Sequence, residues 1–267
     1  MASEVLLPTS PAEAVTAFGD GAGVTVMGGG TIVMPDVTYG RLRPSRLLML
    51  AKSGLDQIIR SDGVVTIGAA VPIAALEGGD EPLASAAAHV GDIEIRAQAT
   101  VAGNLCAGPG AESPRGDLQA PLIALGARVR SAGAGGERVE PIADFLGATA
   151  GRLVLDLSYD DLPRAAGYAA AWRPHAHHNT ILAVSATRTA DDIRVAVTGA
   201  GPHGVGCPSV EKAFAETGDA ASASQQVLAD VENLLQDDAL ASAWYRQRVL
   251  PGLVEKALVV LGEAENH

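Results

Sequence analysis

The sequence predicts an α+β fold, with an N-terminal region of two lobes followed by a smaller C-terminal domain of antiparallel strands and helices. Short apolar runs separated by Gly- and Pro-rich turns continue as far as Pro163. After it come two strand-like runs joined by Asp191-Asp192, and helical spacing dominates from Ser209 onward. Segregated runs of strands and helices are typical of α+β domains. The expected domains are residues 1–163, with lobes of about 1–52 and 53–163, and residues 164–267.

The first lobe begins with a helix that carries clear start signals. Ser10 is suited to cap it, Pro11 occupies the first helical position, and the helix is expected to end near Gly19. Val24 to Met27 then indicates a strand, which the triple glycine follows, and Arg46 to Leu50 indicates another.

The second lobe contains the strongest turn signal in the chain. Asp62-Gly63 lies between the apolar runs 57–60 and 64–67, a pattern that predicts a β-hairpin. Further along, Thr100-Val101 is interpreted as the end of a strand and Gly103-Asn104 as a turn. The other elements expected here are helices over 72–76, 82–90 and 117–126 and strands over 128–130, 137–140 and 153–157.

The C-terminal domain is expected to combine one strand pair with several helices. The strands are Ile181 to Thr187 and Ile193 to Thr198. The helices cover 210–217, 221–235 and 239–261, the last with a break at Pro251.

Composition excludes several classes of function. Hydrophobic residues make up 48% of the chain but aromatic residues only 3%, so the core must be built from Ala, Val, Leu and Ile. The 31 acidic and 19 basic residues give a net charge of −12. Such a surface repels nucleic acid and anionic membranes.

The cysteine content points to a reducing compartment. Cys106 and Cys207 are the only two cysteines, too few for a structural zinc site or an iron–sulfur cluster. The N-terminus lacks a basic region before an apolar run, and no uncharged run is long enough to span a bilayer. We therefore expect a cytoplasmic protein without membrane insertion.

Two glycine-containing segments are the most informative feature. Met27-Gly28-Gly29-Gly30-Thr31 follows a predicted strand, and Thr100 and Asn104 flank Gly103. A single turn of this kind is usually only a turn. Together, two such loops could surround a diphosphate with backbone amides and no basic side chain. Neither a Rossmann fingerprint nor a phosphate-binding P-loop is present.

These segments resemble those of one family. Residues 26–35 are similar to the first flavin motif of the FAD-binding medium subunits of molybdenum hydroxylases, the carbon monoxide dehydrogenase and xanthine dehydrogenase type. Residues 95–105 resemble the second flavin motif, and residues 67–72 the strand between the two. Residues 113–118 and 122–127 resemble the helix that follows. The resemblance runs in order over nearly the whole chain and weakens after Pro163.

The resemblance implies a fold and a set of FAD contacts. The fold is the two-lobed, vanillyl-alcohol-oxidase-like (PCMH-type) FAD-binding domain, followed by the C-terminal domain of molybdenum hydroxylase flavoproteins. Thr100, Gly103 and Asn104 would lie along the diphosphate and the flavin ring, and Asp117 would accept a hydrogen bond from the adenosine portion. Wrapping of the diphosphate by backbone is implied for the first motif, namely Met27, Gly28, Gly29, Gly30, Thr31 and Ile32.

The implied function is electron transfer through FAD. A large partner subunit would hold the molybdenum cofactor and a small one two [2Fe-2S] clusters, in a dimer of heterotrimers. This chain would pass electrons from the clusters to an external acceptor, with no catalytic side chain and no metal of its own. Two alternatives stay open: a structural subunit that has lost FAD, and a stand-alone flavin oxidoreductase.

The chain departs from the family pattern at Gln98, at Ile32-Val33 and in residues 172–180. Gln98 stands where an arginine is usual, and residues 172–180 differ from the usual basic stretch. That stretch contains His175, His177 and His178, which we do not expect to bind a metal because no carboxylate or cysteine accompanies them. Tyr168 lies where the family can place an aromatic residue near the flavin.

Overall fold

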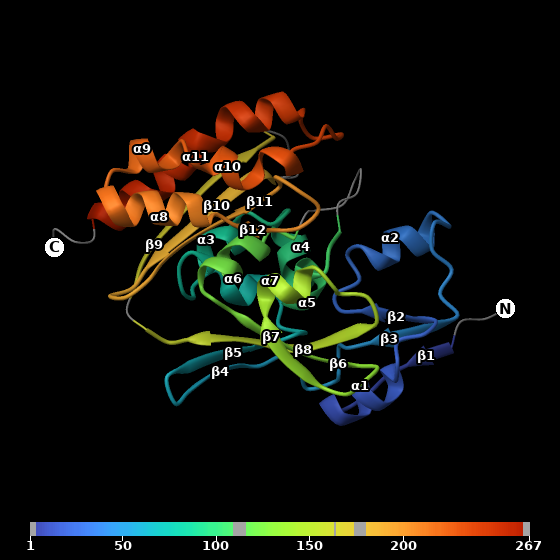
Figure 1. Cartoon of the computed structure of the whole chain (residues 1–267). Coiled ribbons are helices and arrows are strands. Elements are labelled where there is room, and N and C mark those ends of the chain that lie inside the picture. Colours follow the sequence, from blue (N-terminus) through green and yellow to red (C-terminus); the bar gives the residue numbers. More distant parts are fainter. Residues whose placement is uncertain (1–3, 109–115, 163, 174–179, 264–267) are drawn as a thin grey trace. The chain divides into compact units, whose positions relative to one another are not determined.

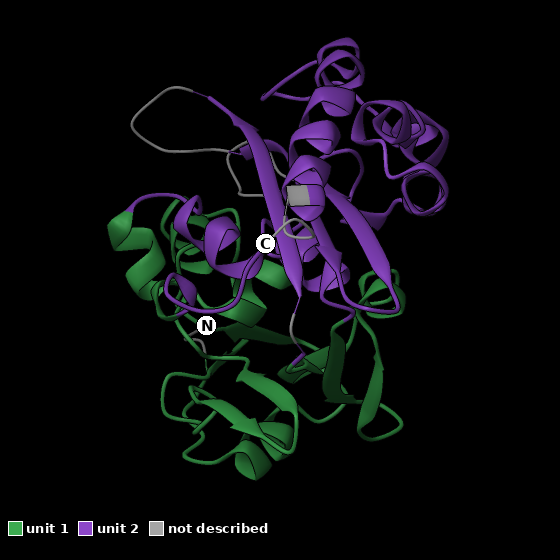
Figure 2. Cartoon of the chain, turned by 90° about the vertical axis from the view of Figure 1, so that its left-hand side faces the viewer, with its two compact units in different colours: residues 1–75, 93–106, 127–161 green, residues 76–92, 107–126, 162–267 purple. Residues whose placement is uncertain are grey.

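The structure is a computed structural model that describes residues 4–108, 116–162, 164–173 and 180–263 (Figure 1). The chain forms two compact units, each assembled from three segments, as Figure 2 shows. The first unit comprises residues 1–75, 93–106 and 127–161, and the second comprises residues 76–92, 107–126 and 162–267. The domain boundaries expected from the sequence stay a prediction.

The first unit contains a small parallel sheet with the strand order β1-β3-β2. Its strands are β1 (Glu4–Leu6), β2 (Val24–Met27) and β3 (Arg46–Met49). The helix α1 (Pro11–Phe18) starts as expected, because Ser10 Oγ accepts a hydrogen bond of 3.2 Å from the Glu13 amide.

An antiparallel sheet with the strand order β4-β5-β8-β6-β7 forms the rest of the first unit's framework. The hairpin prediction is confirmed: Asp62 and Gly63 have φ values of 53° and 74°, as a type I′ turn requires. The central strand β8 buries Leu155 and Leu157 completely or nearly so. The elements are β4 (Ile58–Ser61), β5 (Val64–Gly68), β6 (Arg128–Gly133), β7 (Arg138–Pro141), α7 (Ile142–Leu146) and β8 (Arg152–Asp160).

Short helices connect these sheets, and one of them corrects the sequence analysis. The structure has α2 (Val33–Thr38), η1 (Ile73–Leu76), α4 (Ile93–Gln98) and α5 (Val101–Leu105). The expected strand end at Thr100-Val101 and turn at Gly103-Asn104 are wrong. Thr100 is extended but caps α5, which runs through both Gly103 and Asn104. The hydroxyl of Thr100 accepts a hydrogen bond from the Gly103 amide in the first turn. This cap explains why a β-branched residue stands at the start of a helix here.

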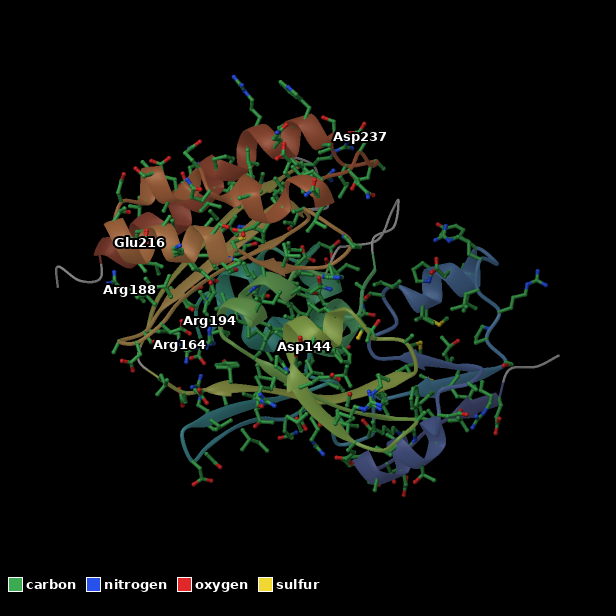
Figure 3. All side chains as sticks on the ribbon, viewed as in Figure 1. Asp144, Arg164, Arg188, Arg194, Glu216 and Asp237 are labelled. Carbon is green, nitrogen blue, oxygen red and sulfur yellow. The ribbon has the colours of Figure 1, made fainter. Side chains whose placement is uncertain are left out.

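The second unit is built on an antiparallel sheet with the strand order β12-β11-β10-β9. Its strands are β9 (Ala165–Trp172), β10 (Thr180–Arg188), β11 (Ile193–Thr198) and β12 (Val205–Gly206). The pair β10 and β11 was expected, whereas β9 was not, because its Ala-rich sequence lacks an alternating pattern. In Figure 3, Arg188 and Arg194 extend from β10 and β11, close to the turn that joins them.

Helices cover one face of this sheet, as Figure 1 shows. Leu182, Val184 and Ala186 of β10 point into the core that these helices form with the sheet. The expected break at Pro251 is wrong, since one helix continues through it. Leu250 and Val254, on either side of the proline, are fully buried, so tertiary packing offsets the missing hydrogen bond. The helical elements are α8 (Pro208–Thr217), α9 (Ala220–Ser224), α10 (Val227–Val231), η2 (Glu232–Leu234) and α11 (Ala243–Glu263).

The opposite face of the sheet carries polar side chains and contacts α6 (Gln119–Ala124), which in turn contacts α3 (Leu83–Ala88). Thr187 Oγ1 donates a hydrogen bond of 2.6 Å to the Ala124 carbonyl. The Ala120 amide donates one of 2.9 Å to Thr198 Oγ1. These two bonds fix α6, and therefore the segment just before it, on the sheet. In the part of the chain that the structure describes, no helix is both long and apolar enough to cross a bilayer.

Candidate functional site

The two glycine segments, far apart in sequence, are in direct contact within the first unit. A Cβ atom at Gly28 would overlap Thr100 Oγ1, and one at Gly29 would overlap the carbonyl oxygen of Gln98. Glycine is therefore required at both positions for the loop after β2 to lie against the segment that enters α5. The structure thus brings together residues that the sequence could only connect through a resemblance.

The loop after β2 presents its backbone amides without internal partners. Met27, the last residue of β2, is held in the sheet by a hydrogen bond of 2.9 Å from the Leu50 amide to its carbonyl. Gly30 has a φ of 78°, which turns the chain toward α2, and its carbonyl accepts from the Met34 amide at 2.9 Å. None of the N–H groups of residues 28–32 donates a hydrogen bond to another described residue.

This arrangement fits an anion. Successive unpaired amides in a turn form a concave, positively polarised surface that binds phosphate groups. Residues 28–32 are all partly exposed, so a ligand can reach their N–H groups. The chemistry available here is binding and orientation, because no acid, base or nucleophile belongs to the loop.

The second glycine segment is anchored by residues 69–73. The Ile73 amide donates to the Ala99 carbonyl at 2.9 Å, and the Val101 amide donates to the Val71 carbonyl at 2.9 Å. The Ala102 amide donates to the Ala69 carbonyl at 3.1 Å. Residues 69–73 therefore hold the segment against which Gly29 packs. Of the strand expected over residues 67–72, only Ile67 and Gly68 belong to β5, and the rest is a turn with an isolated bridge from Pro72 to Thr100.

The environments of Thr100, Gly103 and Asn104 differ. Thr100 and Asn104 are buried, at 7% and 4% exposure, whereas Gly103 is exposed. The amide of Gly103 donates to Thr100 Oγ1 at 3.2 Å. The helix cap therefore uses the N–H of Gly103.

Asp117 belongs to the second unit. It is 4% exposed and lies two residues before α6, whose Gln119 Oε1 accepts a hydrogen bond of 2.6 Å from the Gly204 amide. The N-cap of α6 is Leu118, so Asp117 lies one residue before the cap. A carboxylate this buried needs partners, and it has interactions within the chain.

Tyr168, which the sequence analysis singled out, lies within electrostatic reach of Asp117 and in contact with His89. Burial, and to a smaller extent the charge of Asp117, raise the pKa of Tyr168 well above its usual value. The Tyr168 hydroxyl is buried and bonds to no described residue, and the same holds for Ser185 Oγ, directly across the β9–β10 pair. The ring of His89 contacts that of Tyr168, with 5.5 Å between centroids. No sequence pattern singled out His89, because the contact depends on tertiary structure alone.

Some positions from the sequence analysis lie outside the described residues. These are His175, His177 and His178, and part of the segment matched to the helix after the second motif, residues 113–115. Among the residues that the structure describes, no three His, Cys, Asp or Glu side chains are grouped so that they could hold a metal ion.

Comparison with known protein families identifies the family of this chain. Residues 1–157 match the family described as the FAD binding domain in molybdopterin dehydrogenase. The chain belongs to this family. The family prediction is thereby confirmed, and FAD is the cofactor of the matched domain. No curated protein matches the sequence at a significant level.

Solved structures show the fold over the full length of this FAD-binding family member. A chain of quinoline 2-oxidoreductase from Pseudomonas putida 86 superposes with a TM-score of 0.82 at 18% identity, covering 100% of this chain and 99% of that one. A chain of reconstituted CO dehydrogenase from Oligotropha carboxidovorans gives 0.84 at 20% identity, with 98% of each chain covered. Carbon monoxide dehydrogenase from Hydrogenophaga pseudoflava, lacking the Mo-pyranopterin moiety, gives 0.80 at 20%, with 98% and 97% covered. The predicted fold class is confirmed.

The chemistry of the loop of residues 28–32 suits the diphosphate of FAD. The open amides of residues 28–32 suit a diphosphate, and the close packing on Gln98 and Thr100 leaves no room for a Cβ atom at Gly28 or Gly29. When bound, FAD supplies the redox chemistry, while the chain's own residues bind and orient it.

Proposed function

We propose that this chain is the electron-transfer flavoprotein subunit of a molybdenum hydroxylase complex. The observation that carries the proposal is the loop of residues 28–32 in a chain of the FAD-binding family: its N–H groups donate to no other described residue, and its Gly28 and Gly29 pack on Thr100 and Gln98. The diphosphate of FAD would bind to these amides, with Met27 as the strand end that holds the loop. Thr100, Gly103 and Asn104 would line the same ligand.

Two further residues, Asp117 and Tyr168, are those that the family resemblance connects with FAD. Asp117, as a buried carboxylate, suits a ribose hydroxyl of the adenosine portion. Tyr168, whose hydroxyl is buried and bonds to no described residue, is the aromatic residue that the resemblance associates with the flavin. Neither residue is proposed as an acid or base, because electron transfer through FAD requires none from the chain.

The electron route implies partner subunits. The chain has only two cysteines, so [2Fe-2S] clusters would be carried by a small subunit and the molybdenum cofactor by a large one. The matched solved structures come from CO dehydrogenases and a quinoline oxidoreductase, which supports an assembly of this type. We propose a dimer of heterotrimers in the cytoplasm, in which FAD delivers electrons to an external acceptor.

Copurification tests this assembly. A tagged chain is isolated from its native cells under mild conditions, and flavin, iron, acid-labile sulfide and molybdenum are measured in the purified sample. The proposal predicts all four together with two further polypeptides, one of which retains the iron after the subunits are separated. A chain that purifies with flavin alone would favour a stand-alone flavin oxidoreductase. A colourless chain bound to the two partners would favour a structural subunit.

A further inference from the structure

The helix α2, directly after the loop of residues 28–32, buries none of its six residues. Within it Met34 is 44% exposed, and Tyr39, the residue after it, is 72% exposed. It makes no extensive contact with any other described helix or strand, and Figure 1 shows it apart from the sheets of its own unit. By contrast, four of the five residues of α5 are buried. Packing therefore contributes little to the stability of α2.

Local interactions do not replace the missing packing. The N-cap position of α2 is occupied by Ile32, whose side chain makes no capping hydrogen bond. Helices shorter than about 12 residues are marginal in water, because the first turn fixes several residues for a single hydrogen bond. An ion pair of 2.7 Å between Arg41 and Asp36 closes the far end, but these side chains are 49% and 35% exposed, and such pairs contribute little. By itself, α2 should therefore open readily.

The first turn of α2 is built on carbonyl groups of the candidate diphosphate loop. The Met34 amide donates to the Gly30 carbonyl at 2.9 Å, and the Asp36 amide donates to the Ile32 carbonyl at 3.3 Å. Both acceptors belong to the segment whose N–H groups donate to no other described residue. A ligand that fixes the backbone of this loop also fixes these two carbonyls, and so removes part of the entropic cost of starting the helix.

We propose that α2 folds together with cofactor binding. Without FAD, residues 33–42 exchange between the helix and unfolded conformations, and binding of the diphosphate to residues 28–32 shifts them to the helix. This inference rests on the proposed function, and it requires no contact between FAD and a side chain of α2. The measured affinity for FAD then includes the free energy of ordering α2, so a substitution that favours the helix tightens binding without touching the ligand.

Hydrogen exchange of the full chain, followed by mass spectrometry with and without saturating FAD, tests the change in order. Peptides that cover residues 33–42 should exchange at least about 10-fold more slowly when FAD is bound. Peptides from α7 are the internal control, because Ile142, Phe145 and Leu146 of that helix are buried. They should be protected equally in both samples.

Substitutions at Thr38 test the coupling through affinity. Thr38 is exposed at the end of α2, and its side chain makes no hydrogen bond to a described residue. Because alanine favours a helix more than glycine does, Thr38→Ala should bind FAD about 2- to 5-fold more tightly than Thr38→Gly.

Thr16→Ala and Thr16→Gly form the matched control pair. Thr16 is also exposed on a helix of the first unit, but α1 is anchored by the buried residues Ala14 and Phe18. This pair should differ in stability toward urea and not in FAD affinity. Far-UV circular dichroism establishes that all four variants are folded.

Three results would overturn the inference. Residues 33–42 could be as protected as α7 in the chain without FAD, FAD could bind and leave their exchange unchanged, or Thr38→Ala and Thr38→Gly could bind FAD equally. A parent chain that binds no FAD contradicts the proposed function itself. The FAD titration alone reveals that failure, whereas bound FAD with unchanged exchange contradicts only the coupling to α2.

Discussion

Gly29 faces the carbonyl oxygen of Gln98 so closely that a methyl group on Gly29 would overlap it. This contact joins the loop after β2 to the segment between α4 and α5. It places the open amides of the loop beside Thr100, whose hydroxyl caps α5. The candidate diphosphate site depends on this packing more than on any single side chain.

The neighbouring contact between Gly28 and Thr100 predicts energetic coupling. Gly28→Ala should destabilise the fold by about 2 kcal/mol, because its Cβ overlaps Thr100 Oγ1. Thr100→Ala should cost about 1 kcal/mol through loss of the helix cap. The double variant should cost less than the sum by about 1 kcal/mol, since the overlap is relieved. Urea unfolding of the four proteins measures the cycle, and strict additivity would show that the two segments are not in contact.

The origin of this contact shows what the sequence could and could not provide. Ser10-Pro11 and Asp62-Gly63 act locally, so α1 and the first hairpin were predictable. The meeting of Gly29 with Gln98 is tertiary, and only resemblance to a family indicated that the two segments belong together. The cap at Thr100 was misread because a threonine followed by a valine is as typical of a strand as of a helix start.

Sequence patterns in the second unit are weaker for physical reasons. The strand β9 consists largely of alanine and so has no alternation of polar and apolar residues. Pro251 suggested a break, but the buried leucines around it stabilise a continuous α11. His89 and Tyr168 could not be paired from the sequence, since α3 and β9 are connected only through the fold.

Asp117 offers a test of how the cofactor is recognised. If its carboxylate accepts a hydrogen bond from the adenosine ribose, Asp117→Asn should weaken FAD binding by about 10-fold. Binding of FMN, which has no adenosine, should not change. Asp144→Asn, at an exposed position of α7 that Figure 3 labels, is the control. Equal loss of FAD and FMN affinity would place Asp117 away from the adenosine.

We expect replacement of Arg246 to destabilise the second unit strongly. Its side chain is 1% exposed, and Nη2 donates to both carboxylate oxygens of Asp238 at 2.8 Å. Nη1 donates to the carbonyls of Gln236 and Ala241 at 2.6 and 2.7 Å. Arg246→Met removes these four hydrogen bonds from a buried site, while Asp238 Oδ1 keeps those from the Leu240 and Ala241 amides, and it should lower the free energy of unfolding by about 3 kcal/mol.

The exposed Arg248, two residues further along α11, provides the matched control for this variant. Arg248→Met should change the free energy of unfolding by no more than about 0.5 kcal/mol. Urea unfolding followed by circular dichroism measures both. An equally small effect for Arg246→Met would mean that the connection before α11, where Figure 3 labels Asp237, is not held by this arginine.

The raised pKa of Glu211 predicts that the stability of the fold depends on pH. Burial raises the pKa of its carboxyl above the usual value, although Oε1 accepts a hydrogen bond of 2.8 Å from the Val195 amide. A carboxyl whose pKa is raised in the folded state stabilises the fold when protonated, and that contribution is lost as the pH rises through the folded pKa.

Glu211→Gln keeps an acceptor for the Val195 amide and removes the charge. It should be more stable than the parent at pH 7 by a few tenths of a kcal/mol, because the site is only half-buried and solvent screens the charge. The difference should disappear at acidic pH, where Glu211 is protonated. Thermal melts at neutral and acidic pH check this, and a variant that is less stable at pH 7 would show that the ionised form is favoured.

Equilibrium FAD binding by the purified chain tests the central claim most directly. Flavin absorption and fluorescence are titrated for the parent, for Gly29→Ala, and for Gly147→Ala, whose Cβ would meet only an ordinary 3.5 Å contact with the Asp144 carbonyl. The account predicts that the parent and Gly147→Ala bind FAD alike, while Gly29→Ala loses affinity by at least about 10-fold and remains folded by circular dichroism. Undiminished FAD binding by Gly29→Ala would contradict the assignment of the diphosphate to the loop of residues 28–32.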